Sequence, residues 1–295
     1  MGYFTQNEVL FQQTLVYMIL AISIQVVLRS GVVSLASIGF YTLGAYAGAI
    51  LSKDGWPSFA ILVLVTLVSG LVGYAFGRPV ARLRGLYLAM ATLAFDLVIP
   101  ILLSNGGSFT GGSLGLYGIP VSISTGALVL IVVVVIYVVS QIERGWMGRA
   151  SLALRSDEDL ARSMGIRVAR ERYLSFAISA ALGGLAGGLN GMLFRAVSPS
   201  GIGFGLITLV LAMAIIGGRE SWLGAIIGAY LVTWLPQWLG FIGLYQNLFF
   251  GLILVVVMLF FPDGLLGAAR LGISSLRRRQ IAGREQIPTG KQMAT

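Results

Sequence analysis

Long apolar segments separated by short polar ones run through most of this sequence. A segment of about 18 or more apolar residues is long enough to cross the ~30 Å hydrocarbon core of a bilayer as a helix. Because lipid offers the backbone no hydrogen-bond partners, a spanning segment is either a helix or a strand of a closed barrel. The two-residue alternation that a barrel strand requires is missing. The sequence therefore predicts an all-α fold, a polytopic transmembrane helical bundle.

The composition excludes several kinds of active site. Only 11% of the residues are charged, compared with about 25% in soluble globular domains. The chain has no cysteine and no histidine, which excludes disulfides, thiol nucleophiles, Cys/His metal sites and the usual acid–base catalyst at neutral pH. We expect no catalytic residue, and neither a metal ion nor another cofactor bound by this chain.

About nine spans are expected, with eight or ten as alternatives. The N-terminal residues lack the basic region of a cleavable signal peptide, so the first apolar segment is expected to stay in the membrane. The second segment is rich in glycine and serine, which leaves open a broken or re-entrant helix. We predict one transmembrane domain over 1–267 with a polar loop at 141–172, and a basic, partly disordered tail over 268–295. The predicted spans are 9–28, 32–52, 58–77, 85–103, 121–140, 173–194, 202–217, 221–240 and 245–261.

Basic residues are distributed unevenly between the two sides that these spans define. If the C-terminus is cytoplasmic, all of the 20 Lys and Arg except Lys53 and Arg195 fall in cytoplasmic segments. This is the positive-inside asymmetry of multi-pass membrane proteins, so we predict an outside N-terminus and a cytoplasmic C-terminus. The net charge of +9 is then a topology signal, and no nucleic acid partner is expected. The basic tail is expected to lie on the anionic head groups of the bilayer.

Glycines four residues apart recur in several spans and are densest in the sixth. That span has one series at Gly183, Gly187 and Gly191 and a second at Gly184 and Gly188. A spacing of four puts each series on one helix face, where neighbouring backbones can approach closely. Ordinary helix packing accounts for the pattern, and the alternative is a helix that slides or rotates as the protein works.

The polar loop over 141–172 contains the pattern of a short helix. Ser156 is a good N-cap, and Asp159, three residues later, completes a capping-box pattern. Gly165 supplies a left-handed stop at the other end.

One face of this short helix is apolar. Leu160 and Met164 are four residues apart and share it, with Ala161 beside them. A helix of about two turns is marginal alone in water, so this one needs a surface to pack on. Two interpretations are open: the protein's own loops or the membrane surface, or a groove on a separate motor protein.

Four stretches, in order over most of 25–267, carry a resemblance to a known family. They are SLASIGFYTLGAYAGAIL, GLYLAMATLAFDLVIP followed by TGGSLGLYGIP, GRASLALRSDEDLARSMGIRVARERYLSFAISAALGGLAGGLNG, and GLILVVVMLFFPDGLLG. The chain resembles the permease subunits of Liv-type branched-chain amino acid ABC importers, and the LivM-like subunit more than the LivH-like one.

The resemblance implies a membrane-spanning permease in a bacterial inner membrane. It implies an ATP-driven importer of branched-chain or related small amino acids, with urea, amides or aromatic acids as alternatives within the family. The implied partners are a second homologous permease, two cytoplasmic ATPases that bind ATP and Mg²⁺, and an extracytoplasmic substrate-binding protein. By this likeness, the segment from Ser156 to Gly165 couples the permease to an ATPase. Arg219 and Glu220 depart from the glycine-rich turn usual at this place, and they form either an ATPase contact or a solvated turn.

The sequence itself has no GxxxxGK[ST] loop, so this subunit is not expected to bind ATP or to be an enzyme. Asp96 is an acidic residue deep in a span, ~16 Å along it from Gly85 at about 1.5 Å per residue. Intramembrane carboxylates usually face a cavity or a partner. Asp96, with Thr92 one turn before it, is therefore a candidate for the translocation pathway, and a structural hydrogen-bond acceptor is the alternative. A self-contained secondary transporter or channel that uses Asp96 is the rival function.

Overall fold

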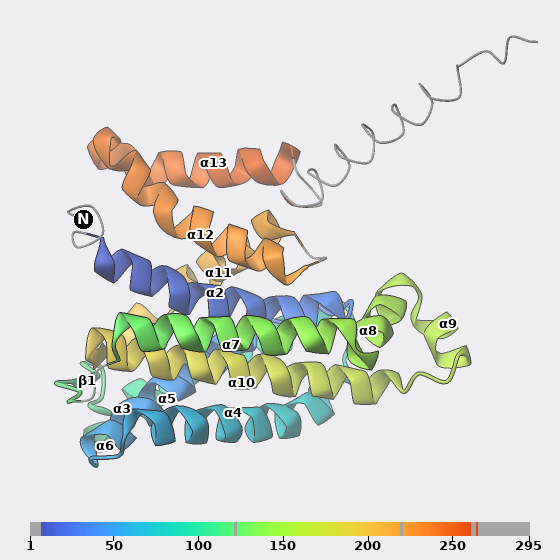
Figure 1. Cartoon of the computed structure of the whole chain (residues 1–295), viewed down its shortest axis with the longest axis horizontal. Coiled ribbons are helices and arrows are strands. Elements are labelled where there is room, and N and C mark those ends of the chain that lie inside the picture. Colours follow the sequence, from blue (N-terminus) through green and yellow to red (C-terminus); the bar gives the residue numbers. More distant parts are fainter. Residues whose placement is uncertain (1–6, 121–122, 219–220, 261–263, 265–295) are drawn as a thin grey trace, which may run out of the picture.

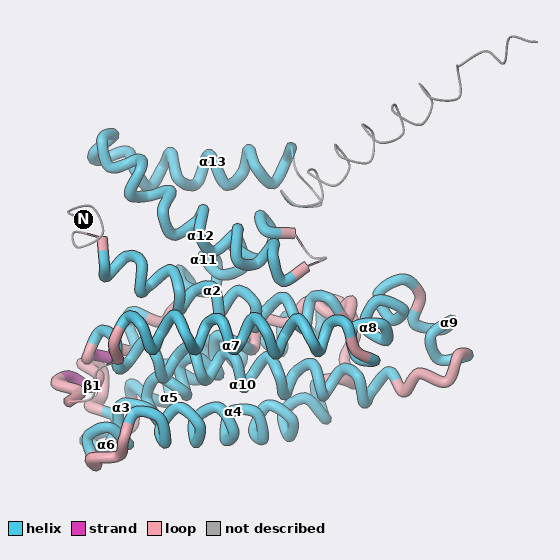
Figure 2. Tube along the Cα trace, in the orientation of Figure 1, coloured by secondary structure: helices cyan, strands magenta, loops and turns pink. Residues whose placement is uncertain are grey.

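Antiparallel helices lie side by side along the long axis of the molecule in the computed structural model (Figure 1). The structure describes residues 7–120, 123–218, 221–260 and 264. Strands occupy only two residues each, at one end of the bundle (Figure 2). The helices are α2 Glu8–Arg29, α3 Ser37–Lys53, α4 Ser58–Val80, α5 Leu86–Ser104, α6 Gly107–Thr110, α7 Thr125–Arg144, α8 Trp146–Ser156, α9 Glu158–Ser163, α10 Val168–Phe194, α11 Phe204–Gly217, α12 Trp222–Trp238 and α13 Gln246–Phe260, with 3₁₀ turns η1 Pro199–Gly201 and η2 Leu239–Tyr245 and strands β1 Leu116–Tyr117 and β2 Ala196–Val197.

The prediction of an all-α, polytopic membrane protein is confirmed. Each of the nine predicted spans overlaps one helix, namely α2, α3, α4, α5, α7, α10, α11, α12 or α13. Among the described residues, six stretches are long and apolar enough to cross a bilayer: α2, α4, α5, α7, α10 and the stretch Pro199–Gly217. Helices α3 and α12 have 17 residues and α13 has 15. The count of nine spans and the sidedness of the termini stay predictions.

The second predicted span needs a correction at its beginning. Helix α3 starts at Ser37, and the chain before it is not helical from Val32 to Leu35. Gly31 makes the turn out of α2 with a φ of +77°, a conformation that glycine adopts without strain. Most of this segment is buried, including Leu35 at 6% exposure. Irregular backbone is tolerated at membrane depth when protein covers it in this way.

Helix α10 is the centre of the bundle. It packs against α2, α3 and α4, and 72% of its most apolar stretch is buried. The corresponding shares are 28% for α4 and 22% for each of α5 and α7. Helices α4, α5 and α7 therefore present broad apolar faces outward, as expected for surfaces that meet lipid or another membrane subunit.

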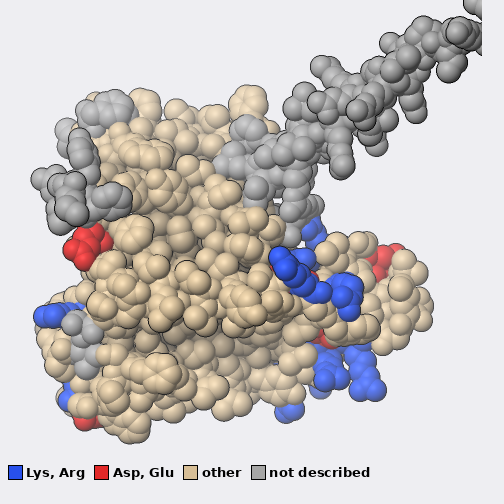
Figure 3. Space-filling view, in the orientation of Figure 1, with Lys and Arg blue, Asp and Glu red and all other residues tan. Residues whose placement is uncertain are grey.

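Charged side chains separate the two ends of the bundle. The arginines gather at the end that carries α8 and α9, as Figure 3 shows. The opposite end carries the antiparallel pair of β1 and β2, in which Leu116 faces Val197, together with Lys53 and Arg195. The predicted Arg219–Glu220 turn and the basic tail over 268–295 lie outside the described residues.

Candidate functional site

The polar loop between α7 and α10 holds two short helices instead of the single one predicted. Asp157, not Ser156, is the N-cap of α9. Its Oδ1 accepts hydrogen bonds from the backbone N–H groups of Asp159 at 2.9 Å and Leu160 at 3.0 Å. Ser156 belongs to the last turn of α8, where its hydroxyl donates to the Leu152 carbonyl at 3.1 Å. The N-cap prediction was wrong by one residue because α8 continues through Ser156.

The side chains of α9 divide between an inner and an outer face. Ala161 is 1% exposed and packs with Leu154 and Val168 in a small apolar cluster. Leu160 and Met164 are 59% and 69% exposed. The helix thus rests on its own protein through Ala161 and leaves its two larger apolar side chains uncovered.

Gly165 ends this helical turn with a φ of +83°, as the left-handed stop predicted. No heavy atom lies within 4 Å of a Cβ built at this position. The demand for glycine at Gly165 therefore comes from the backbone conformation and not from crowding.

Glu158 fixes α9 to the membrane helices behind it. One carboxylate oxygen accepts from Arg162 at 2.8 Å and from Arg84 at 3.3 Å, and the other accepts from Arg172 at 2.8 Å. Arg172 belongs to α10, and Arg84 lies in the turn between α4 and α5. A single side chain therefore joins the exposed short helix to two elements of the bundle. Sequence reasoning missed this cluster, because Arg172 is 14 residues and Arg84 is 74 residues from Glu158 along the chain.

Asp96 and Thr92 lie on one face of α5 and hold the start of α3. Asp96 is 1% exposed, and its Oδ1 accepts from the backbone N–H of Gly39 at 2.7 Å. Thr92 is fully buried, and its hydroxyl oxygen accepts from the N–H of Leu35 at 3.3 Å. Both bonds go to N–H groups at or just before the beginning of a helix, which have no partner within it.

This geometry assigns the predicted pair a definite structural task. The second carboxylate oxygen of Asp96, Oδ2, is buried without a hydrogen-bond partner in the described part of the chain. Neither Asp96 nor Thr92 lines the apolar cavity between α3 and α4 or the polar cavity between α2, α3, α10 and α11. A role of this pair in a translocation pathway stays a prediction.

The glycines of α10 lie where its neighbours come closest. A Cβ at Gly187 would overlap the carbonyl oxygen of Tyr41, and one at Gly184 would overlap the hydroxyl of Ser69. A Cβ at Gly183 would lie 2.5 Å from the Ser37 carbonyl oxygen. These contacts come from α3 on one side and α4 on the other.

The other two glycines of the series are less crowded. A Cβ at Gly191 would lie 3.0 Å from Val197 Cγ2, whereas one at Gly188 would meet nothing closer than Leu62 Cδ2 at 3.5 Å. Contact at 3.0 Å requires a neighbour to move slightly, and contact at 3.5 Å is ordinary packing. The series of glycines therefore contains both required and tolerant positions.

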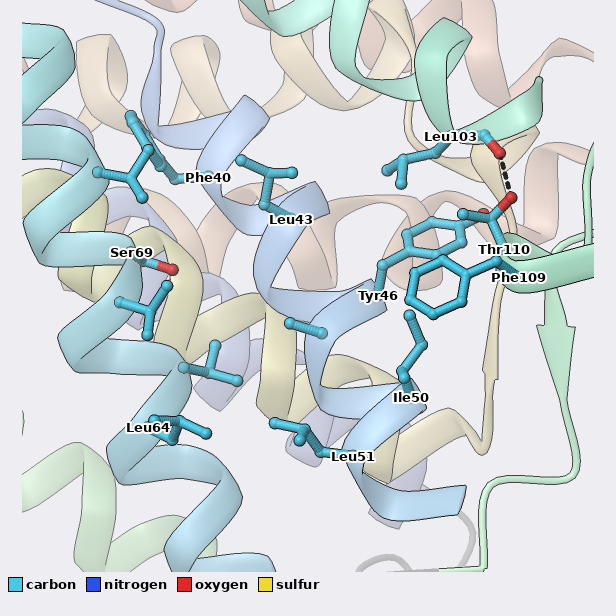
Figure 4. A pocket seen from close by; sticks show the side chains of 14 residues that line it. Phe40, Leu43, Tyr46, Ile50, Leu51, Leu64, Ser69, Leu103, Phe109 and Thr110 are labelled. Carbon is cyan, nitrogen blue, oxygen red and sulfur yellow. Dashed lines mark hydrogen bonds between the residues drawn. The ribbon is translucent and has the colours of Figure 1, made fainter. Parts of the chain in front are cut away.

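An apolar cavity of about 490 Å³ opens between α3 and α4 and reaches α6 (Figure 4). Figure 4 shows Leu43, Tyr46 and Ile50 of α3 on one wall, with Phe109 beside the ring of Tyr46. Its few polar groups include Thr110, whose hydroxyl donates to the Leu103 carbonyl at 2.6 Å. Such a surface suits hydrocarbon and offers little to a polar solute.

A second cavity, of about 220 Å³, is polar and lies between α2, α3, α10 and α11. Tyr17, Tyr41 and Asn190 contribute side chains from three different helices. Sequence reasoning missed this site. The only available signal was that each of these residues is an isolated polar group in an apolar span, and nothing in their spacing shows that they meet.

The chain is similar to known membrane proteins over most of its length. A family described as the permease component of branched-chain amino acid transport systems matches residues 8–260. The high-affinity branched-chain amino acid transport system permease protein LivM of Salmonella typhimurium is 34% identical, over 87% of this chain and 69% of that protein. LivM of Escherichia coli K12 is 32% identical over the same shares. No solved structure matches the chain.

A more distant relative has a different substrate in its name. The xylose/arabinose import permease protein XylH of Sulfolobus acidocaldarius is 23% identical, over 88% of this chain and 78% of that protein. Similarity along nearly the whole length is thus compatible with cargo as different as an amino acid and a sugar.

Proposed function

The chain belongs to the family of permease components of branched-chain amino acid transport systems and is LivM-like within it, and from this premise we propose how it works in an ABC importer. It is the membrane-spanning subunit through which an aliphatic amino acid passes. ATP hydrolysis takes place in separate subunits, and the loop with α8 and α9 receives their motion. The observation that carries this proposal is the uncovered pair Leu160 and Met164 on a helix fixed to the bundle.

We propose that α9 docks into an apolar groove on a cytoplasmic ATPase. Leu160 lies in α9 and Met164 is the C-cap residue directly after it. Two large apolar side chains are costly to leave in water, and a partner groove removes them from it. Arg162 lies within α9, and Arg155 and Arg167 lie a few residues before and after it along the chain. A groove with acidic side chains at its rim would therefore attract and orient α9.

The outward faces of the permease offer surfaces for the other subunits proposed here. Helices α4, α5 and α7 turn broad apolar faces outward, and one such face is proposed to meet a second, homologous permease. Two ATPases below this heterodimer and an extracytoplasmic substrate-binding protein above it complete the assembly. The loops around β1 and β2 are at the end where the binding protein would deliver its ligand.

The orientation of the chain in the membrane is proposed from the distribution of its arginines. The end with α8 and α9 carries the arginines and would face the cytoplasm of a bacterial inner membrane. Helices α3, α12 and α13 complete nine spans in this arrangement, with the N-terminus outside and the C-terminus in the cytoplasm. In this orientation, the substrate enters the helical bundle at the β1–β2 end and leaves it at the end that carries α9.

Branched-chain amino acids are the proposed cargo. The relatives named for this cargo are 34% and 32% identical to the chain, whereas the sugar permease is 23% identical. Urea, amides and aromatic acids are the alternative substrates. The binding protein, which would be the main determinant of specificity, would select among them.

Purification of the detergent-solubilised chain from its native membrane tests the proposal. Mass spectrometry is expected to find a second permease, an ATPase and a binding protein with it. The purified assembly in vesicles is expected to accumulate leucine only with ATP on the α9 side. Recovery of the chain alone, together with ATP-independent leucine uptake, would overturn the importer and favour a self-contained transporter.

A further inference from the structure

The polar cavity between α2, α3, α10 and α11 is separate from the exposed α9 surface that would dock an ATPase. Its lining includes Ala196 and Val197 of β2, and Figure 1 shows the β1–β2 end of the bundle opposite α8 and α9. Its volume of about 220 Å³ corresponds to roughly seven water molecules at about 30 Å³ each. A small amino acid is an occupant of this size.

Hydrogen-bonding capacity in this cavity is largely unused. The hydroxyl of Tyr17 accepts from the Gln13 side-chain amide at 3.0 Å, so its own proton stays free to donate. The Tyr41 hydroxyl and the Asn190 carboxamide make no hydrogen bond within the described part of the chain. Polar groups at membrane depth are costly when unpaired. An occupant that pairs with them is therefore favoured.

The lining of the cavity combines two kinds of side chain. Tyr17, Tyr41 and Asn190 are polar, whereas Phe194, Ile202 and Leu206 are apolar. Ligand sites typically combine an apolar lining with a few polar groups that fix orientation. A solute with a polar head and an aliphatic side chain matches both kinds of lining residue.

No lysine, arginine, aspartate or glutamate is among the residues that line this cavity. An isolated net charge is expensive to bury in such surroundings. A zwitterion has no net charge, and its adjacent carboxylate and ammonium groups can each be paired by neutral partners. Tyrosine hydroxyls and the Asn190 amide can donate to the carboxylate, and the Asn190 carbonyl oxygen can accept from the ammonium.

A residue with a strained backbone directly precedes two of the lining residues. Arg195, which follows α10, has a φ of +53° and is the one non-glycine residue with a left-handed backbone in the described ranges. The next residues, Ala196 and Val197, pair with β1 and line the cavity. Strained residues of this kind often mark functional segments, and this one immediately precedes lining residues of the cavity.

We propose that this cavity is a transient binding site, within the translocation path, for the zwitterionic head of an aliphatic amino acid. The inference rests on the proposed function and specifies the residues in this chain that contact the cargo. Tyr41 and Asn190 bind the head group, and the apolar lining residues accommodate the side chain. Binding must be weak enough for release, as in any conduction path.

Uptake by the reconstituted transporter, with its ATPase and binding protein, tests the two head-group residues. Tyr41→Phe and Asn190→Leu each remove hydrogen bonds to a charged group, so leucine uptake is expected to fall about tenfold or more. Copurification of the ATPase with each variant checks that the assembly has formed. Tyr46→Phe is the matched control, because Tyr46 is on the same helix but lines the apolar cavity. Unchanged uptake by both test variants, with an active wild-type assembly, would overturn this inference alone.

A thiol probe reports occupancy directly, even if one of the uptake variants fails to fold. The chain has no cysteine, so Ser198→Cys places a single thiol at the cavity wall. Leucine is expected to slow labelling of this thiol by a maleimide, and arginine, which has a net charge, is not. Equal labelling rates with and without leucine would mean a water-filled structural cavity. If the wild-type assembly imports no amino acid, the proposed function itself is wrong, and the inference falls with it.

Discussion

The Oδ1 oxygen of Asp96 accepts a hydrogen bond from the backbone N–H of Gly39 at 2.7 Å. A Cβ at Gly39 would lie 2.9 Å from the same oxygen and 2.5 Å from the Phe95 ring. The acid on α5 can therefore reach the first turn of α3 only because position 39 has no side chain. A carboxylate at this place also complements the positive end of the α3 dipole.

Substitution of Asp96 separates this structural task from a role in transport. In Asp96→Asn the amide oxygen can still accept from Gly39, so we expect near-normal stability and leucine uptake. In Asp96→Ala the N–H of Gly39 loses its partner, which is expected to destabilise the fold by about 1–3 kcal/mol. Thermal unfolding of the detergent-solubilised chain and uptake in vesicles are the measurements. If Asp96→Asn is as stable as the wild type but does not transport, Asp96 belongs to the pathway after all.

Gly39→Ala is expected to disturb the same contact from the other side. The added methyl group would push Phe95 and Asp96 away, and overpacking of this kind typically costs about 1–3 kcal/mol. Because both changes break one hydrogen bond, the double variant Gly39→Ala with Asp96→Ala should be less destabilised than the sum of the single variants. Additive unfolding free energies would show that the two residues act independently.

The helices could be predicted from the sequence because the property that makes each segment helical is local to that segment. Runs of apolar residues and the absence of membrane hydrogen-bond partners dictate helical spans wherever they occur. The depth of Asp96 also followed from its position in such a run. The hydrogen-bond donor to Asp96 could not be predicted in this way. Gly39 is 57 residues away along the chain, and only the packing of α5 on α3 brings the two residues together.

The same reasoning explains what was missed in the polar loop and the cavity. Two adjacent residues, Ser156 and Asp157, are both acceptable N-caps by type. Asp157 is the N-cap in the structure because α8, which was not predicted from the sequence, extends through Ser156. Tyr17, Tyr41 and Asn190 meet only after three helices have packed.

The exposed pair on α9 gives a prediction about assembly. Leu160→Asp together with Met164→Asp is expected to abolish copurification of the ATPase, because charged side chains replace the apolar ones that the groove would bury. Both positions are exposed, so the stability of the chain itself should change by less than about 0.5 kcal/mol. Leu114→Asp is the control, since Leu114 is 77% exposed at the opposite end. Retention of the ATPase by the double variant would rule out docking through α9.

Glu158 is expected to matter more for coupling than for stability. Its three arginine contacts are partly exposed, and such pairs contribute only about 0–1 kcal/mol each. Glu158→Gln should therefore fold and assemble, while α9 moves more freely against α10 and less leucine is imported per ATP hydrolysed. Asp159→Asn is the matched control, because Asp159 forms no ion pair in the described part of the chain. A normal ratio of uptake to ATP hydrolysis in Glu158→Gln would show that this cluster does not transmit motion.

Adjacent glycines in α10 should respond in opposite ways to the same change. Gly187→Ala places a methyl group against the Tyr41 carbonyl oxygen, a backbone atom that can yield only if α3 moves. Gly188→Ala meets only ordinary contacts, and alanine is the better helix former by up to about 1 kcal/mol. We expect a lower unfolding temperature for Gly187→Ala, and an unchanged or higher one for Gly188→Ala.

Transport by the same two variants bears on whether α10 slides. If the glycines serve only close packing, Gly188→Ala should import leucine at the wild-type rate, because the resting contacts are kept. If α10 moves along α4 during the cycle, the new methyl group would meet Val65 and Leu62 in another register and slow uptake without loss of stability. A stable but slow Gly188→Ala would therefore favour sliding, and a stable and fast one would leave packing as the sufficient explanation for glycine at Gly187 and its neighbours.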